Sequence, residues 1–258
     1  MNSPTIVWFR LDFRLADHPA LAAAEKRGGA VLPVFIWAPE EEGAWPPGEA
    51  SRWWLHQSLV RLGEQLRKQG AELILCRGPS ARALLNLARE TGARAVYWNR
   101  RYEPAIIARD TRLQEELRAA GLEVESFNGA LLHEPWEIEK KSGGPFQVFT
   151  PFWRTCLAQP ETAPLPAPVA LRWLKRGQKP RSLPLSELEL EPKLDWTTGL
   201  KAAWRPGSEG AWGELTRFLR DPVLEYDAVR NMPGRAGTSR LSPHLHFGEI
   251  SPREVWQA

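Results

Sequence analysis

A short run near the end of the chain carries the residue types best suited to hold a phosphate group. It reads Gly237-Thr238-Ser239-Arg240-Leu241-Ser242-Pro243 and places three hydroxyls and one guanidinium within five residues. Small hydroxyl residues cap the free N–H groups of a helix start, and proline fits the first turn because no donor is needed there. The same donors, together with the forked guanidinium of Arg240, also suit a phosphate or pyrophosphate. The pattern alone leaves both interpretations open, because most such runs only cap a helix.

The longer run around these residues resembles a known cofactor signature. Thr238-Ser239-Arg240-Leu241-Ser242, followed by Gly248-Glu249-Ile250-Ser251-Pro252-Arg253, is similar to the flavin-binding signature of the DNA photolyase/cryptochrome family. The resemblance implies that Thr238, Ser239, Arg240, Leu241 and Ser242 bind FAD around its phosphates. It also implies that Tyr226 contacts the cofactor and that Arg230 binds DNA beside the flavin pocket. The plain alternative for Arg230 is a surface salt bridge.

Length and composition indicate a globular intracellular protein. The chain has 258 residues, a formal net charge of +3 and two cysteines, Cys76 and Cys156. This length allows one large or two ordinary domains, and the mildly basic charge permits nucleic-acid binding without requiring it. Two cysteines make neither a disulfide framework nor a zinc site, and no apolar run reaches membrane-spanning length. We therefore expect a cytoplasmic protein with no metal site and no membrane partner.

The first half of the chain alternates predicted strands with predicted helices. Residues 30–37 are almost continuously apolar, as in a strand buried on both faces, whereas residues 49–69 repeat apolar side chains at helical spacing. The predicted strands are 5–9, 30–37, 72–76, 93–98 and 122–127, and the predicted helices are 19–26, 49–69, 80–90 (capped by Ser80) and 103–120. This order predicts a doubly wound α/β fold with a parallel five-stranded sheet, whose ligands bind at the carboxyl ends of the strands.

The loop after the first predicted strand is rich in charge. Its charged residues alternate in sign: Arg10, Asp12, Arg14 and Asp17. We expect these side chains to pair with one another and pin the loop, and we assign them no chemistry. The run from Trp8 to His18 also resembles the opening motif of the same family, with Phe13 in place of a leucine and His18 in place of an asparagine.

The segment after the fourth predicted strand lies where a ligand of the sheet is expected. It contains Trp98-Asn99 and Tyr102-Glu103-Pro104, which fit the family pattern. In that family the α/β domain binds a second, light-harvesting chromophore, called the antenna. The Asn-Glu pair that holds a folate in some members is replaced here by Ala105-Ile106. The identity of the antenna therefore stays open among a folate, a deazaflavin, another flavin or none.

After residue 130 the alternation stops. Residues 144–153 resemble an inter-domain element of the family, and their aromatic side chains predict packing of one domain on another. Residues 160–206 are rich in proline and carry scattered cations, which indicate a solvated linker or, alternatively, a nucleic-acid contact: Lys175, Arg176, Lys179 and Arg181. We predict an α/β antenna domain at 1–130, an inter-domain linker at 131–206 and the start of a helical FAD-binding domain at 207–258. Because the sequence ends within a predicted helix, we expect an N-terminal fragment.

The resemblance extends over nearly all of the chain and implies a function. It implies light-dependent repair of cyclobutane pyrimidine dimers by electron transfer from reduced FAD, in a monomeric lyase that acts on UV-damaged DNA. We expect the fragment alone to be inactive. Two alternatives remain: a cryptochrome-type blue-light photoreceptor, and a stand-alone nucleotide-binding α/β module without catalysis. Light-dependent repair by the complete protein would distinguish a photolyase from a photoreceptor. Cooperative folding of the 258 residues alone would favour the stand-alone module.

Overall fold

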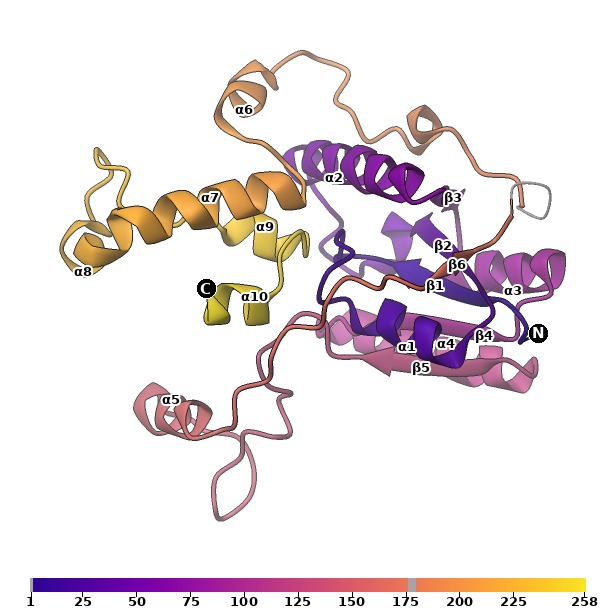
Figure 1. Cartoon of the computed structure of the whole chain (residues 1–258), viewed down its shortest axis with the longest axis horizontal. Helices are drawn as coiled ribbons and strands as arrows, with labels where there is room; N and C mark the ends of the chain where they lie inside the picture. Colours follow the sequence, from indigo (N-terminus) through magenta and orange to yellow (C-terminus); the bar gives the residue numbers. More distant parts are fainter. Residues whose placement is uncertain (1, 176–179) are drawn as a thin grey trace.

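The computed structural model describes residues 2–175 and 180–258, and the predicted linker cations Arg176 and Lys179 lie outside this part. An α/β body occupies one end, and two helical arms project from the other (Figure 1). The strands are β1 (Thr5–Phe9), β2 (Ala30–Trp37), β3 (Ile74–Arg77), β4 (Ala95–Asn99), β5 (Glu123–Phe127) and β6 (Arg172–Trp173). The helices are α1 (Pro19–Arg27), α2 (Glu49–Lys68), α3 (Ser80–Thr91), α4 (Pro104–Ala119), α5 (Phe149–Leu157), α6 (Thr198–Ala203), α7 (Ser208–Arg220), α8 (Tyr226–Val229), α9 (Ser242–His246) and α10 (Pro252–Gln257), with 3-10 turns at Pro39–Glu41, Leu185–Leu188 and Pro222–Glu225.

The sheet confirms the predicted parallel, doubly wound fold. Its strand order is β3-β2-β1-β4-β5, and every pair in it is parallel. The sequence did not predict β6, which pairs with Ala30 and Val31 of β2. A strand of two residues within a proline-rich segment has no periodicity to detect. It is held by the backbone N–H of Leu174, which donates to the carbonyl of Val31 at 3.0 Å, and by burial of the Leu174 side chain.

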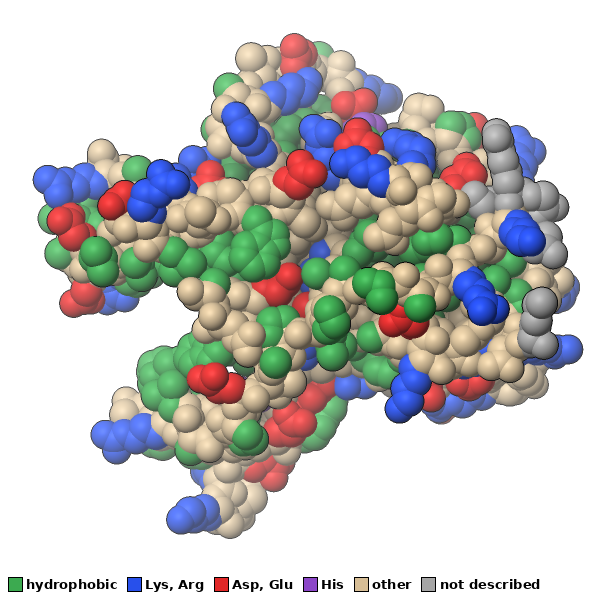
Figure 2. Space-filling model, viewed as in Figure 1, with side chains coloured by type: hydrophobic (Ala, Val, Ile, Leu, Met, Phe, Trp, Pro, Cys, Tyr) green, Lys and Arg blue, Asp and Glu red, His purple; other side chains and the backbone are tan. Residues whose placement is uncertain are grey.

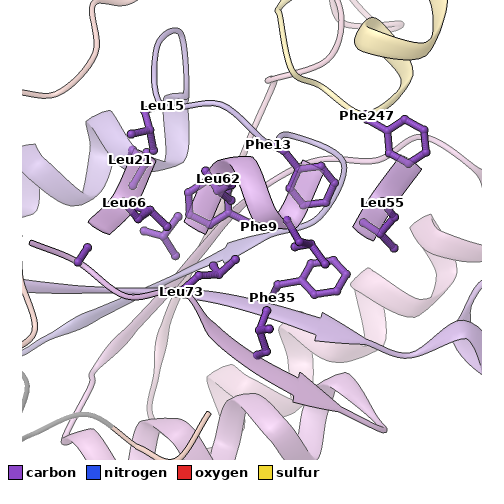
Figure 3. Packing of buried hydrophobic residues seen from close by; sticks show 14 of the residues in the cluster. Phe9, Phe13, Leu15, Leu21, Phe35, Leu55, Leu62, Leu66, Leu73 and Phe247 are labelled. Carbon is purple, nitrogen blue, oxygen red and sulfur yellow. The ribbon is translucent and has the colours of Figure 1, made fainter. Parts of the chain in front are cut away.

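Helices cover both faces of the sheet because β1 and β2 are apolar on both sides. Helices α1 and α2 pack on the face that carries Val7 and Phe9 of β1. Helices α3 and α4 pack on the face that carries Ile6 and Trp8. Phe247, from the far end of the chain, inserts beside Phe13 and Leu55 in the first of these cores (Figure 3). The C-terminal segment is thereby fixed to the α/β body by apolar burial.

The start of α3 corrects one prediction. Ser80 is not the N-cap, because Pro79 occupies that position and makes no side-chain capping bond. Instead the backbone N–H and hydroxyl of Ser80 donate to the carboxylate of Glu41, at 2.8 and 2.5 Å. A carboxylate from another element therefore compensates the free donors and the positive end of this helix.

The helical part has a small core and large exposed apolar faces. Its buried residues are Ala211 and Leu215 of α7, with Leu241 and Ile250. Apolar side chains lie exposed on α5 and along α7 and the turn after it, among them Phe149, Trp153, Leu157, Trp212, Leu219 and Leu224. Figure 2 shows hydrophobic side chains on both sides of the hollow between α5 and α7. Such paired apolar faces are typical of surfaces that pack against further protein. Within the described residues, no helix is both long and apolar enough to cross a bilayer.

Candidate ligand-binding site

A cleft of about 630 Å³ opens at the carboxyl ends of β2, β1 and β4. This edge includes the point between β1 and β4 where the strand order reverses, the position at which doubly wound sheets bind ligands. Its lining includes Arg10 after β1, Trp37 at the end of β2, Arg101 after β4, and Trp45, which is 90% exposed. The cleft therefore lies at the edge of the sheet where the sequence predicted ligand binding.

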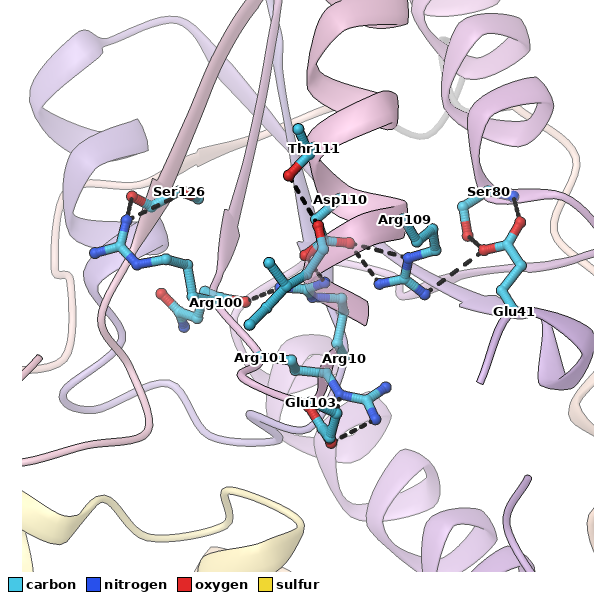
Figure 4. Close-up of polar contacts among 12 residues, drawn as sticks. Arg10, Glu41, Ser80, Arg100, Arg101, Glu103, Arg109, Asp110, Thr111 and Ser126 are labelled. Atoms are coloured by element: carbon cyan, nitrogen blue, oxygen red, sulfur yellow. Dashed lines mark hydrogen bonds and ion pairs between the residues drawn. The ribbon is translucent and has the colours of Figure 1, made fainter. Parts of the chain in front are cut away.

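Two arginines share one carboxylate at the base of this cleft. Nη1 of Arg10 lies 2.6 Å from Oδ2 of Asp110, and Nη2 of Arg109 lies 2.7 Å from Oδ1 of the same residue (Figure 4). Both guanidinium groups also lie over the indole ring of Trp8, at 4.9 and 5.1 Å from its centroid. Burial lowers the pKa of Arg10, and the Asp110 charge opposes this shift. The ion pair with Asp110 thus compensates a guanidinium that is only 4% exposed.

The third arginine of the cleft is paired with two carboxylates. Arg101 donates through both terminal nitrogens to Glu42, each at 2.7 Å, and also to Glu103 at 2.7 Å. Burial alone would lower the pKa of Arg101, but the hydrogen bonds and charges of Glu42 and Glu103 outweigh it and raise that pKa. Arg109 also lies 3.6 Å from the carboxylate of Glu41, so Arg10, Arg109 and Arg101 all have protein carboxylates as partners. The cleft offers aromatic and apolar walls with balanced charge rather than a free cation for a phosphate.

Two buried donors in the cleft wall have no hydrogen-bond partner among the described residues. They are Nε1 of Trp8 and Nε of Arg10. A buried donor left unpaired costs about 1–3 kcal/mol, so such groups call for an explanation in a native structure. Both residues line the cleft, but the two donor atoms themselves are buried in its wall. At the other side, His246 has its pKa lowered by partial burial and by the Arg101 charge.

The charged loop after β1 is pinned, but not in the predicted way. The prediction that its four charged side chains pair with one another is wrong for the described residues. Asp12 accepts from the side chain of Asn99 at 2.8 Å, and Arg14 donates to the carbonyls of Gly129 and Gly248, at 2.6 and 3.0 Å. Asp17 accepts from Nε of Arg253 at 2.9 Å, and Arg10 pairs with Asp110 as described above. Because these partners come from distant elements, the loop joins the α/β body to the C-terminal segment.

The predicted flavin-binding residues lie outside the cleft. Residues 238–242 form one loop, called here the flavin loop, in which Leu241 is buried against α7 while Thr238 and Ser242 are exposed. Arg240 has a positive φ of 57°, stacks its guanidinium 4.1 Å from the centroid of Trp204 and donates to the carbonyl of Ala203 at 2.7 Å.

The hydroxyls of the flavin loop do not cap the helix that follows it. Helix α9 begins after Leu241 without a side-chain capping bond. The contrast is α10, where Ser251 and Glu254 form a complete capping box. The capping interpretation of the run 238–242 is therefore wrong for α9. Within the loop the Ser239 hydroxyl accepts from the backbone N–H of Leu241 at 3.4 Å, whereas Thr238 and Ser242 are exposed.

Tyr226 and Arg230 lie together on α8, beside the flavin loop. Tyr226 is 40% exposed, and the Arg230 guanidinium lies 5.9 Å from its ring centroid. Arg230 also lies 3.8 Å from the exposed carboxylate of Asp227, which is the surface ion pair of the alternative interpretation. The approach of α8 to the loop requires Gly237, because a Cβ there would lie 2.3 Å from Cγ2 of Val229.

Sequence reasoning missed most of the cleft. Arg109 and Asp110 lie inside a helix, where nothing local distinguishes them from surface charges. Glu42 and Trp45 lie in a long connection for which we predicted no structure. The one usable signal was the Trp45-Pro46-Pro47 run, since an aromatic residue in a rigid loop at a strand end is unusual.

Comparison with known proteins places this arrangement in a family. Residues 5–169 match the family model described as DNA photolyase. The chain is 46% identical over 259 residues to the deoxyribodipyrimidine photo-lyase of Agrobacterium fabrum, covering 100% of this chain and 53% of that protein. It is 43% identical over 260 residues to cryptochrome-1 of Arabidopsis thaliana, covering 98% of this chain and 37% of that protein. The crystal structure of a class III photolyase from Agrobacterium tumefaciens superposes with a TM-score of 0.93 at 45% identity, covering 100% of this chain and 53% of that one.

The fold and cleft define a doubly wound α/β protein with a cleft at the switch point of its sheet. With the family match and these relatives, the assignment becomes specific: the chain belongs to the DNA photolyase family. It spans about half the length of the photo-lyase it matches.

Proposed function

We propose that the protein to which this chain belongs repairs cyclobutane pyrimidine dimers in UV-damaged DNA, using reduced FAD as a light-driven electron donor. The observation that carries this proposal is the flavin loop: its hydroxyls are not used to cap α9, and its sequence matches the family's flavin signature. FAD supplies the photochemistry when bound, and the protein holds it and presents the lesion.

The residues of the loop fit an FAD phosphate group. Thr238, Ser239 and Ser242 would donate through their hydroxyls, and Arg240 would add charged donors. Leu241, only 3% exposed, anchors the loop in the core of α7 and so fixes where these donors lie. Tyr226, on the neighbouring helix, would pack against the cofactor. Arg230 would contact a DNA phosphate beside it.

We propose that the cleft at the switch point holds the antenna chromophore. The partnered arginines favour a flat aromatic ring system without a phosphate, because no guanidinium in the cleft wall lacks a carboxylate partner. Trp37 and Trp45 of the cleft lining offer aromatic surfaces against which such a ring system would pack. A folate ring and a deazaflavin both meet these requirements, whereas a flavin nucleotide would bring a phosphate that finds no free cation there.

The exposed apolar faces support a further proposal about the complete protein. We propose that α5 and α7 pack against additional helices of an FAD-binding domain, since the photo-lyase relative is about twice as long as this chain. FAD and DNA binding would then need residues that this 258-residue chain does not contain. A blue-light photoreceptor is the second candidate function, supported by the 43% identity to cryptochrome-1.

A repair assay on the complete protein tests the proposed function. We expect illuminated protein to restore UV-irradiated DNA and unlit protein not to do so; bound FAD without repair would favour the photoreceptor. Arg240→Ala should lower flavin affinity by about 10- to 100-fold, the worth of a hydrogen bond to a charged group. Arg205→Ala, which removes an exposed arginine next to Trp204 in the sequence, is the matched control. Unchanged flavin content of the Arg240 variant after gel filtration would defeat its assignment.

A further inference from the structure

One five-residue helix connects the two proposed binding sites. Helix α9 starts at Ser242, the last residue of the flavin loop. Its last residue, His246, and the next residue, Phe247, line the cleft. Any shift of α9 along or about its axis therefore moves the wall of the cleft and the end of the flavin loop together.

A single buried carboxylate fixes α9 against α2. Glu249 is 1% exposed, and its Oε2 lies 2.5 Å from Nδ1 of His244, in the middle of α9. Its Oε1 accepts from Nε1 of Trp54 at 3.1 Å and from the hydroxyl of Ser58 at 2.7 Å, both on α2. A carboxylate buried among three donors is held in one geometry, because losing any of them leaves a buried polar group unpaired.

The same carboxylate is linked to the cleft through aromatic packing. The indole of Trp54, which donates to Glu249, stacks on Phe247 with 5.9 Å between centroids and 12° between planes. Helix α2 also contributes Ser51 and Leu55 to the cleft wall. Glu249 itself does not line the cleft and lies seven residues beyond the flavin loop. It would therefore act on both ligands without touching either.

We infer that Glu249 is a positioning residue that couples FAD binding at the flavin loop to antenna binding in the cleft, an inference that rests on the proposed function. Ser242, the exposed end of the flavin loop, is also the first residue of α9, so α9 is shared by both sites. Because Glu249 ties α9 to α2, the position of α9 that one ligand favours is passed on to the cleft wall, and the second ligand meets that position already set. The coupling is reciprocal, so each chromophore tightens the other by the same factor.

The test is the ratio of FAD dissociation constants of the complete protein without and with the cleft filled. Methenyltetrahydrofolate and a 5-deazaflavin, added separately at saturation, serve as probes for the cleft. We expect the better-binding probe to tighten FAD about fivefold or more in the wild type. Glu249→Ala should bring the ratio close to one, a loss of about fivefold or more. Ser58→Ala removes one donor with little loss of packing, and it should lower the ratio in the same direction.

A control variant and the contrary results are well defined. Glu64→Ala removes an exposed carboxylate of α2 that pairs with Arg61, and it should leave the ratio unchanged. If Glu249 has only a structural role, its replacement lowers stability but leaves the ratio of FAD dissociation constants unchanged in every variant that still binds both chromophores. An unchanged ratio would contradict the inference. If Glu249→Ala does not fold, the ratio measured for Ser58→Ala decides whether the two sites are coupled through this carboxylate. A wild-type ratio of one with both chromophores bound would refute the coupling alone, whereas a complete protein that binds no FAD would refute the proposed function as well.

Discussion

The cleft and the flavin loop differ in how completely this chain builds them. The cleft is surrounded by strand ends, two helices and paired arginines, and Arg10 is buried together with its partner Asp110. The flavin loop rests on one buried leucine and exposes most of its donors. The difference teaches that the α/β fold by itself forms the cleft, whereas this chain leaves the flavin loop beside the exposed apolar faces of α5 and α7. The predictions below probe that contrast.

The largest effect is expected where a buried charge loses its partner. Asp110→Ala leaves the 4%-exposed Arg10 uncompensated and should lower the free energy of unfolding by about 3–5 kcal/mol. Asp227→Ala, near the flavin loop, removes only a fully exposed partner of Arg230. It should change the free energy of unfolding by less than about 0.5 kcal/mol. Urea denaturation of both variants checks this pair. Equal losses would remove the distinction between the two regions.

A pair of glycine substitutions should change stability in opposite directions. Gly248 has a φ of +60°, and a Cβ there would lie 2.2 Å from the carbonyl oxygen of Leu11, so Gly248→Ala should cost about 1–3 kcal/mol. Gly213, inside α7, has nothing within 4 Å of its added Cβ, so Gly213→Ala should gain about 0.5–1 kcal/mol. Thermal unfolding measures both changes. A tolerated Gly248→Ala would show that the loop after β1 does not pack closely on the C-terminal segment.

Replacing Trp45 tests ligand binding in the cleft without disturbing the fold. Because its ring is 90% exposed at the cleft, Trp45→Ala should leave stability unchanged. Stacking between aromatic rings is worth about 0.5–1.5 kcal/mol, so antenna affinity should fall by about two- to tenfold. Fluorescence titration with the antenna probes provides the measurement, with Trp136→Ala, an exposed tryptophan outside the cleft lining, as control. Equal affinities of the two variants would place the ligand elsewhere.

The smallest effect concerns pH. The pKa of His246 is lowered in the folded protein by partial burial and by the Arg101 charge, so the unfolded chain binds more protons near that pKa. Stability should therefore be fully retained above about pH 6.5, the unfolded pKa, and fall as the pH drops below it. His246→Gln lacks this group and should show a shallower decline between about pH 6.5 and 5. If the stabilities of the wild type and of His246→Gln fall in parallel over that range, His246 is not the group that causes the decline.

Much of the fold was predictable because its signals are local. The near-continuous apolar run of β2 and the helical spacing in α2 fixed the alternation, and strand ends were correct to within two residues. The start of α3 was misassigned because Glu41, which satisfies Ser80, comes from another element. When a carboxylate from a distant element caps a helix, the sequence next to that helix carries no signal of it.

The sites were less predictable because they depend on contacts between distant residues. The flavin loop is contiguous in sequence, so its motif was visible. By contrast, Arg10 meets Asp110 across one hundred residues, and Trp54 meets Glu249 across almost two hundred. Periodicity and motif spacing carry no information about such pairs, which only the topology of the sheet brings together.

The most direct test is to offer both kinds of chromophore to the 258-residue chain and measure which one it retains through gel filtration. The absorption spectrum of the eluted protein identifies what is bound. If the cleft is complete and the flavin loop is not, the chain retains methenyltetrahydrofolate or the 5-deazaflavin and loses FAD. Retention of FAD at one equivalent with neither antenna probe bound would contradict this account of the two sites.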